Sequence, residues 1–195
     1  MKPHSEACER NRDPILKVLQ QWLLGAGTVL EIGAGTGQHA AYFAQHLPHL
    51  TWQPTDREEN LAGIRLWVEE SGAANLRDPI RLDVTDSVWP IERADYIFSA
   101  NTAHIMSWPE VEAMFAGVGR VLATKGRFCL YGPFNRDGQF TSDSNREFDA
   151  MLRARDPNMG IRDDQALIAL GRKHGLEFAA DNSMPARNRL LIWSK

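Results

Sequence analysis

The sequence contains little of what marks secreted, membrane and nucleic-acid-binding proteins. Its 195 residues include only two cysteines, too few for a disulfide framework, which predicts a cytoplasmic protein. The apolar runs are all shorter than the roughly 18 residues of a membrane-spanning helix, and residues 1–13 are too polar for a secretory signal. A formal net charge of −3 offers no basic surface for a nucleic acid. We therefore expect a small-molecule partner, with neither nucleic acid nor membrane involved.

The composition is that of an ordinary globular protein. Hydrophobic residues make up 43% and charged residues 24% of the chain. A folded chain of this mass should expose roughly 9,300 Å² and bury about 70% of its extended surface, enough for a substantial core. The sequence has no internal repeat and no linker, so we expect one domain over residues 1–195.

Segments of strand and helix character alternate along the chain. A helix is predicted to begin at Asp13–Pro14, an N-cap followed by a first-turn proline. The other predicted helices are 37–47, 60–70, 111–122, 144–155 and 163–174, and the predicted strands are 28–32, 50–55, 80–84, 94–100, 127–131, 176–180 and 189–193. Strands separated by helices predict a Rossmann-like α/β fold with a mainly parallel seven-stranded sheet covered on both faces. The last two strands lack an intervening helix, which predicts a C-terminal antiparallel hairpin.

A glycine-rich loop follows the first predicted strand. Residues 31–38 read EIGAGTGQ, a strand end that leads through three alternating glycines into a helix. Ligands of open α/β sheets bind at such strand ends. The spacing differs from the dinucleotide fingerprint G-x-G-x-x-G, and the carboxylate of Glu31 would repel a pyrophosphate but attract a cation. S-adenosylmethionine (SAM), which has an ammonium, a sulfonium and no phosphate, therefore fits better than NAD(P) or a turn without a ligand. The predicted cofactor contacts of this loop are Glu31, Gly33, Ala34, Gly35, Thr36, Gly37 and Gln38.

Polar residues also follow the second, third and fourth predicted strands. Asp56 stands where nucleotide-binding folds place an acid that accepts from the ribose hydroxyls. Asp83 is placed to accept from the exocyclic amine of an adenine, with the backbone N–H of Val84 beside it. Asn101 is expected next to the transferable methyl group. Turn or cap roles are the structural alternatives for these residues.

The motifs together resemble the class I SAM-dependent methyltransferases, and more closely the family of methyltransferase-like 26 proteins. The resemblance covers nearly the whole chain. The segments that carry it are RNRDPIL (10–16), EIGAGTGQHA (31–40), WQPTD (52–56), 101–108, YGPF (131–134), SNREFD (144–149), GIRD (160–163) and MPARN (184–188). It departs from the expected pattern at Arg187, where asparagine is expected. The resemblance implies SAM binding and methyl transfer but no particular substrate.

Methyl transfer from a sulfonium is an in-line displacement, so the protein mainly positions the nucleophile and excludes water. His104 is the candidate general base, and Tyr131 is a candidate to bind or deprotonate the substrate. Structural roles for both side chains remain open. The segment 101–108, NTAHIMSW, lacks the Asn/Asp-Pro-Pro-Tyr/Phe pattern of amino-group DNA methyltransferases.

Two further segments are expected to form the substrate side. Residues 1–13 are predicted as an N-terminal lid and residues 132–162 as a substrate-side insert. The candidate substrate contacts, with helix capping and solvation as the alternatives, are Arg10, Asn11, Arg12, Ser144, Asn145 and Arg162. No metal site is expected. The sequence predicts a SAM-dependent methyltransferase of small molecules, with S-adenosylhomocysteine (SAH) as product. A non-catalytic SAM-binding or partner-binding protein and an NAD(P)-dependent oxidoreductase are the alternatives.

Overall fold

Strands and helices alternate along residues 2–195, the part of the chain that this computed structural model describes. The helices are α1 (Glu6–Trp22), α2 (Gln38–His46), α3 (Glu58–Ser71), α4 (Trp108–Val121), α5 (Asp143–Arg155), α6 (Asp164–Lys173) and the 3-10 turn η1 (Pro185–Arg187). The strands are β1 (Gly27–Ile32), β2 (Leu50–Asp56), β3 (Ile80–Arg81), β4 (Ala94–Ala100), β5 (Leu122–Gly132), β6 (Phe134–Asn135), β7 (Arg162–Asp163), β8 (Glu177–Ser183) and β9 (Arg189–Ser194).

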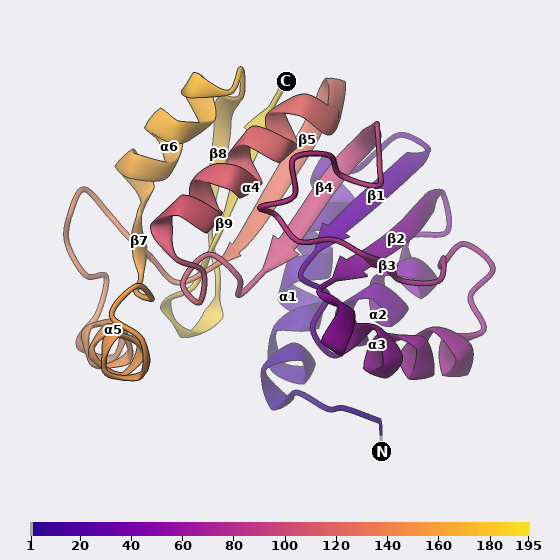
Figure 1. The fold of residues 1–195 in the computed structure, drawn as a ribbon, viewed down its shortest axis with the longest axis horizontal. Coiled ribbons are helices and arrows are strands. Elements are labelled where there is room, and N and C mark those ends of the chain that lie inside the picture. Colours follow the sequence, from indigo (N-terminus) through magenta and orange to yellow (C-terminus); the bar gives the residue numbers. More distant parts are fainter. Residues whose placement is uncertain (1) are drawn as a thin grey trace.

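Seven strands form one sheet in the order β3-β2-β1-β4-β5-β9-β8 (Figure 1). Strands β1 to β5 pair in parallel, and β9 runs antiparallel to both of its neighbours. The predicted α/β Rossmann-like fold with a C-terminal antiparallel hairpin is confirmed. Because the order reverses between β1 and β4, the carboxyl ends of these two strands open a crevice at the sheet edge.

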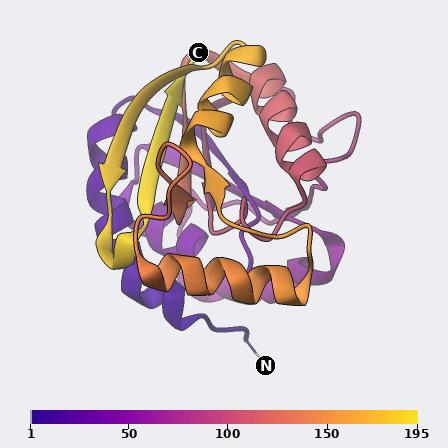
Figure 2. The same ribbon diagram turned by 90° about the vertical axis from the view of Figure 1, so that its left-hand side faces the viewer.

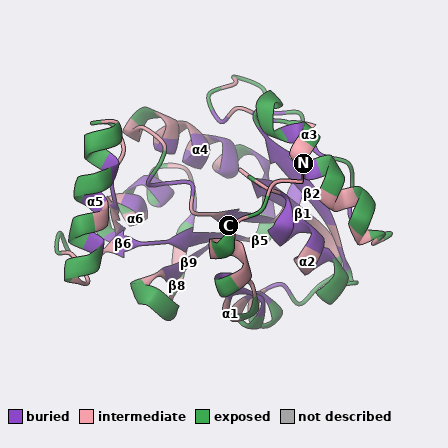
Figure 3. Cartoon of the chain, turned by 90° about the horizontal axis from the view of Figure 1, so that it is seen from below, coloured by how far each residue is buried: buried purple, intermediate pink, exposed green. Residues whose placement is uncertain are grey.

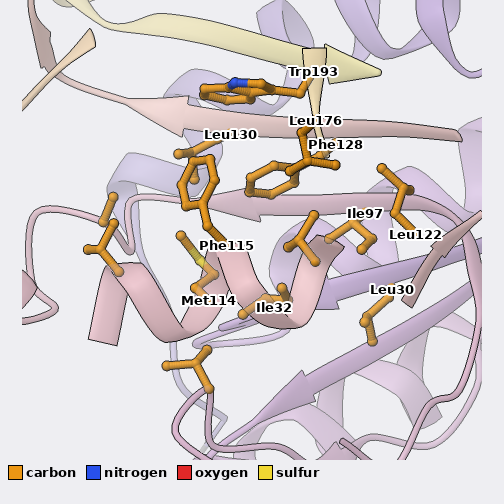
Figure 4. Packing of buried hydrophobic residues seen from close by; sticks show 14 of the residues in the cluster. Leu30, Ile32, Ile97, Met114, Phe115, Leu122, Phe128, Leu130, Leu176 and Trp193 are labelled. Carbon is orange, nitrogen blue, oxygen red and sulfur yellow. The ribbon is translucent and has the colours of Figure 1, made fainter. Parts of the chain in front are cut away.

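Two apolar layers fix the sheet between its helices. Helices α4 and α6 cover one face, and α1 and α2 cover the other. In the first layer, Phe115 of α4 meets Phe128 and Trp193 with ring centroids 5.4 Å and 5.2 Å away (Figure 4). The rings meet edge to face, a favourable geometry for aromatic pairs. None of the helices in residues 2–195 is long and apolar enough to cross a membrane.

The prediction that the first helix begins at Pro14 is wrong. Helix α1 begins at Glu6, and Ser5 caps it by accepting a hydrogen bond from the Cys8 N–H. Pro14 lies inside the helix, where its missing N–H leaves the carbonyl of Arg10 without an intrahelical donor. Burial of the next turn, including Ile15, against the sheet keeps the helix continuous. The segment 1–13 is therefore mostly the first two turns of α1.

The predicted insert, residues 132–162, contains β6, α5 and the start of a small parallel pairing between β6 and β7. This second sheet was not expected. Helix α5 lies beyond the carboxyl ends of the main strands, at the same end of the molecule as the N-terminus (Figure 2). Its outward side is exposed, whereas the central strands are buried (Figure 3). The insert therefore builds outward from the edge of the sheet where ligands are expected.

Candidate active-site cleft

A cleft of about 1200 Å³ opens at the carboxyl ends of β1, β2, β4 and β5. One half, the glycine-loop half, is lined by residues 32–36, Asp56, Arg57, Glu59, Asn60, Leu82 and Val84. The other, the insert half, is lined by residues 104–106 with Pro133, Asn145, Phe148, Asp156, Met159, Pro185, Ala186 and Asn188. The first two turns of α1 and the ends of β4 and β5, with Asn101 and Tyr131, lie between the halves. One continuous cleft thus brings together segments that are distant in the sequence.

The glycine loop keeps a conformation that other residues adopt rarely. Gly33, Gly35 and Gly37 have φ values of 70°, 58° and 90°. A Cβ at Gly37 would lie 3.0 Å from the Cα of Ile64 in α3, so this glycine serves helix packing. A Cβ at Gly35 would meet nothing within 4 Å, because that position faces the open cleft. Gly35 therefore leaves space for a ligand, whereas Gly37 holds the loop against the neighbouring helix.

Asp56, at the end of β2, secures this loop. Its carboxylate accepts from the Gly35 N–H at 2.7 Å, from the Arg57 N–H at 2.7 Å and from Asn60 Nδ2 at 2.8 Å. The side chain is 8% exposed and lines the cleft beside Gly35. Asp56, the residue predicted to bind the ribose, thus lies in the cleft, and three internal donors hold its carboxylate.

Glu31 lies beneath the loop, fully buried, and outside the set of residues that line the cleft within 2–195. Its carboxylate accepts from Trp52 Nε1 at 2.7 Å. Burial raises the pKa of Glu31 to about 8, against the opposing effect of the Trp52 hydrogen bond. A cation placed next to this group would restore its ionised form.

Asn101, His104 and Tyr131 meet at the ends of β4 and β5, as predicted. Asn101 has φ of 59° and donates its backbone N–H to the carbonyl of Tyr131 at 2.9 Å. His104 is 7% exposed and packs edge to face on Phe148 of α5. Burial and then the charge of Arg162 lower the pKa of His104 to about 4, so its imidazole is neutral at pH 7. Burial raises the pKa of Tyr131, so its hydroxyl is protonated.

Gln38 and Arg12 hold the N-terminal segment instead of lining the cleft. Gln38 Oε1 accepts from the Ser5 N–H at 2.5 Å, and its Nε2 donates to Glu9 at 2.9 Å. Arg12 pairs with Glu9 at 2.7 Å and lies over the ring of Tyr42. Both residues are absent from the cleft lining among residues 2–195. Each side chain is already used to seat α1.

Asp83 also lies outside the cleft lining of the described residues. Its carboxylate accepts from the N–H and the hydroxyl of Thr85 at 3.0 Å and 2.7 Å and lies 3.4 Å from Arg57 Nε. The Thr85 hydrogen bonds, with Arg57 contributing, lower its pKa. Leu82 and Val84 line the cleft, but Asp83, between them, does not within the described chain. A tight turn after the short β3 directs the carboxylate to its own backbone.

Ser144 and Arg162 are also placed away from the cleft lining of residues 2–195. Ser144 is exposed and bonds to Ser142, which is the N-cap of α5. Arg162 donates to the carbonyls of Ala103 and Met106 and so ties β7 to the loop after β4. Of the predicted substrate contacts, the cleft lining keeps Arg10, Asn11 and Asn145.

Several lining residues were not anticipated. Cys8 and His39 lie 4.0 Å apart between α1 and α2, and Asn188 follows η1 near Tyr131. His39 and Asn188 fall within the motifs EIGAGTGQHA and MPARN, which gave the only sequence hint of their position. Cys8 gives no such hint, because its neighbour His39 is 31 residues away in the sequence.

The charges that line the cleft are unequal. The lining includes four carboxylates, those of Asp56, Glu59, Glu110 and Asp156, and two guanidinium groups, those of Arg10 and Arg57. Arg57 is already paired with Glu110 at 2.5 Å. The surplus of negative charge suits a cationic ligand better than a pyrophosphate. Within residues 2–195, no group of three or more His, Cys, Asp or Glu side chains is placed to hold a metal ion.

Comparisons with known proteins give this chain a family and a fold. Residues 2–195 match the family DUF938, described as a protein of unknown function. The chain belongs to this family. Its resemblance to solved structures is at the level of the fold.

Three solved structures illustrate that likeness. An O-methyltransferase family protein from Burkholderia thailandensis matches at 16% identity with a TM-score of 0.82, over 97% of this chain and 57% of that one. An O-methyltransferase family 2 protein from Planctomyces limnophilus, in complex with apigenin, matches at 16% identity and 0.83 over the same shares. CalO1, a methyltransferase in calicheamicin biosynthesis with SAH bound, matches at 20% identity and 0.76, over 94% and 53%. This DUF938 chain thus has the class I methyltransferase fold and spans little more than half of these proteins.

Proposed function

We propose that this protein is a SAM-dependent methyltransferase acting on a small molecule. The observation that carries the proposal is the glycine-loop half of the cleft. Gly35 leaves open space above a buried acid, Glu31, and beside the fixed carboxylate of Asp56. SAM needs those three elements: room for its thioether chain, an anion near its ammonium, and acceptors for its ribose. The closer resemblance to methyltransferase-like 26 proteins and a cytoplasmic location belong to the same proposal.

The residues present fit the cofactor. A buried carboxylate whose pKa is raised to about 8 lacks a nearby cation, and the SAM ammonium would supply one. The Gly33–Thr36 backbone would hold the amino-acid end, Asp56 the ribose, and Leu82 and Val84 the adenine face. When bound, SAM supplies a methyl group on a sulfonium, which an acceptor atom displaces in line.

The insert half would hold the methyl acceptor. Ile105, Met106, Phe148 and Met159 give it an apolar wall, and the helical first turns of α1 close the opposite side. Such a wall excludes water and orients the acceptor, which is most of what an activated methyl donor requires. His104 is neutral at pH 7 and so can accept a hydrogen bond from the attacking group, whereas the protonated hydroxyl of Tyr131 can donate one.

The fold neighbours support the same class. Several are described as O-methyltransferases, and one was solved with apigenin, a small aromatic molecule. The chain spans little more than half of their length, so their substrates do not transfer to it.

A thermal-shift series tests cofactor binding. We expect SAM and SAH to raise the melting temperature and NAD(P) to leave it unchanged. Gly35→Arg should abolish the shift by filling the loop. Gly72→Arg is the matched control, because Gly72 has φ of 60°, close to the 58° of Gly35, and open space at its Cβ, but lies outside the cleft lining. Stabilisation by NAD(P) alone would contradict the proposal.

Transfer of a labelled methyl group to a metabolite extract tests catalysis. A methyltransferase should yield a labelled product whose formation falls in His104→Asn and in Asn101→Ala, since both side chains line the junction of the two halves. SAM binding without any labelled product would instead identify a non-catalytic SAM-binding protein.

A further inference from the structure

Helix α5 contributes two neighbouring side chains to the insert half of the cleft. Asn145 and Phe148 both line the cleft, and because they are three residues apart they share one face of the helix. Phe148 in turn packs edge to face on His104, with the ring centroids 5.3 Å apart. An amide, an aromatic ring and an imidazole therefore follow one another along this side of the cleft.

The amide of Asn145 is held in one orientation. Its Nδ2 donates to Thr141 Oγ1 at 2.9 Å and to the carbonyl of Arg187 at 3.3 Å. A carbonyl oxygen only accepts, so the nitrogen must face Arg187 and Oδ1 must point away from it. Asn145 is only 6% exposed, yet among residues 2–195 its Oδ1 accepts no hydrogen bond and is not enclosed by protein. This oxygen is therefore an accessible acceptor with a fixed direction.

The imidazole of His104 is accessible in the same way. The residue is 7% exposed, and in the described chain neither ring nitrogen has a hydrogen-bond partner or is enclosed by protein. A neutral imidazole has one acceptor and one donor nitrogen. A buried polar group costs free energy unless it is hydrogen-bonded, so both side chains favour a ligand that can bond to them. For the Asn145 oxygen, that ligand must carry a donor.

The rest of the insert half offers apolar surface. Ile105 is 49% exposed and lines the cleft. The other large apolar side chains that are exposed in residues 2–195 all lie outside its lining: Leu24, Leu66, Val88 and Met151. Met106, Phe148 and Met159 extend the apolar lining, and thioethers and aromatic rings adapt well to apolar ligands. An exposed apolar surface at a cleft indicates a ligand whose body is apolar.

The charges of the insert half disfavour an anion. Asp156 is the one charged side chain in its lining within the described residues, and its carboxylate accepts from the Asn158 N–H at 2.8 Å. The nearby cations are engaged elsewhere. Arg153 pairs with Asp149 at 2.7 Å, and Arg162 donates to backbone carbonyls. An anionic ligand in this half would therefore meet a carboxylate and no cation.

We propose that the insert half binds an uncharged, largely apolar molecule with a hydroxyl or amino group that donates to Asn145 Oδ1. The apolar body would lie against Phe148, and carboxylates and phosphates would be excluded. The role of this molecule as the methyl acceptor rests on the proposed function, whereas its binding does not. Asn145 is then a specificity-determining residue, because its oxygen selects a donor at one place on the ligand.

Three naphthalene probes that differ in one substituent test the class of ligand. 2-Naphthol has a donor, 2-methoxynaphthalene has the same ring and oxygen without the donor, and 2-naphthoate has an anion. Calorimetry on SAH-saturated wild-type protein gives their dissociation constants. We expect 2-naphthol to bind about fivefold more tightly than 2-methoxynaphthalene, the usual gain for one hydrogen bond between neutral groups. 2-Naphthoate should bind at least about tenfold more weakly than 2-methoxynaphthalene, because its charge would be desolvated without a partner.

A pair of variants tests the role of Asn145. Asn145→Leu removes the oxygen, so the preference for 2-naphthol over 2-methoxynaphthalene should fall below about twofold. Ser144→Leu is the matched control at the adjacent, exposed position outside the cleft lining, and it should keep the preference. Binding of 2-methoxynaphthalene to Asn145→Leu within about twofold of the wild type would show that the apolar surface is intact. The wild-type comparison of the three probes stands without either variant.

The outcomes separate this proposal from the proposed function. Wild-type protein that does not bind SAH overturns the proposed function, and the probes on unliganded protein then still test the insert half. Equal affinities for 2-naphthol and 2-methoxynaphthalene, or no binding of any probe, overturn the proposal made here. So does tight binding of 2-naphthoate, and its loss in Arg10→Met would place that anion on α1. A preference for 2-naphthol that survives Asn145→Leu overturns the role of Asn145.

Discussion

The two halves of the cleft are held by different kinds of contact. In the glycine-loop half, Asp56 and the loop it secures are joined by short hydrogen bonds to backbone N–H groups. In the insert half, Arg162 reaches from β7 to the carbonyls of Ala103, Met106 and Asn158 across gaps of 59, 56 and 4 residues. One half is fixed between the ends of the neighbouring strands β1 and β2, by a bond across 21 residues, and the other depends mainly on side-chain ties across more than 50 residues. The first should be rigid toward a common cofactor, and the second adaptable toward a particular acceptor.

The largest expected effect tests the rigidity of the glycine-loop half. Gly37→Ala should destabilise the fold by about 3 kcal/mol, because it adds left-handed strain and places a Cβ 3.0 Å from the α3 backbone. Gly138→Ala, in the insert at φ of 76° with open space, should cost only about 1 kcal/mol. Urea denaturation of both variants measures the difference. Equal losses would show that packing against α3 contributes little.

The next effect breaks the long-range ties of the insert half. Arg162→Met should cost about 2 kcal/mol, because it removes the donors to three backbone carbonyls while keeping the apolar stem. It should also raise the pKa of His104, since the Arg162 charge helps to lower that pKa. Denaturation and NMR titration of His104 check the two effects.

The affinity for SAH shows whether a change in the insert half reaches the glycine-loop half. This affinity should change by less than about twofold in Arg162→Met, because the glycine-loop half is secured separately. Arg155→Met, at the exposed end of α5, is the control that removes a charge without a carbonyl contact. A large loss of SAH binding in Arg162→Met would mean that the two halves form one mechanical unit.

The contrast also explains what the sequence can predict. The seven-stranded sheet, its hairpin and the glycine loop could be predicted because each follows from a short stretch of sequence. Examples are EIGAGTG and Asp56 at the end of β2. The start of α1 was missed because Pro14 resembles a first-turn residue, and only burial of the following turn shows that the helix runs through it.

Residues whose side chains turn to other partners could not be read in the same way. Arg162 was predicted as a ligand contact, but it donates to backbone carbonyls 59 and 56 residues away, which no spacing reveals. Asp83 was predicted from its place at a strand end, but its carboxylate accepts from Thr85, two residues on. The hydrogen-bonded chain of Cys8, His39 and Asn11 was missed because nothing in the sequence marks these residues as neighbours. They come together only when α1 packs on α2. Long-range contacts decide the cases of Arg162 and of the Cys8–His39–Asn11 chain.

A smaller effect concerns pH and the buried acid of the glycine-loop half. The pKa of Glu31 is raised from 4.5 to about 8 by burial, so the unliganded fold holds a proton that the unfolded chain has lost between these values. Stability from this group is therefore complete below pH 4.5 and is lost as the pH rises through 8. A bound ammonium favours the ionised acid, so binding releases that proton.

We expect SAH to bind several-fold more tightly at pH 8 than at pH 6, with proton release in calorimetry at the lower pH. Glu31→Gln should flatten this dependence, because the amide cannot ionise. The insert half gives the opposite trend in stability. His104, with its pKa lowered to about 4, costs stability as the pH falls from 6.5 through 4. An unchanged SAH affinity from pH 6 to 8 would show that Glu31 does not meet the ammonium.

The smallest expected effect lies at the rim of the insert half, in the turn η1. Arg187 has φ of 58° and is exposed, and its side chain must adopt a left-handed backbone that asparagine tolerates better. Asn101, at φ of 59°, shows that choice at the other rim of the cleft. Arg187→Asn should therefore raise stability by about 0.5–1 kcal/mol, or about 2 °C in Tm. Differential scanning calorimetry measures the gain. A loss of stability would mean that the arginine side chain stabilises the turn by more than the left-handed backbone costs. The asparagine expected at this position would then serve the ligand and not the fold.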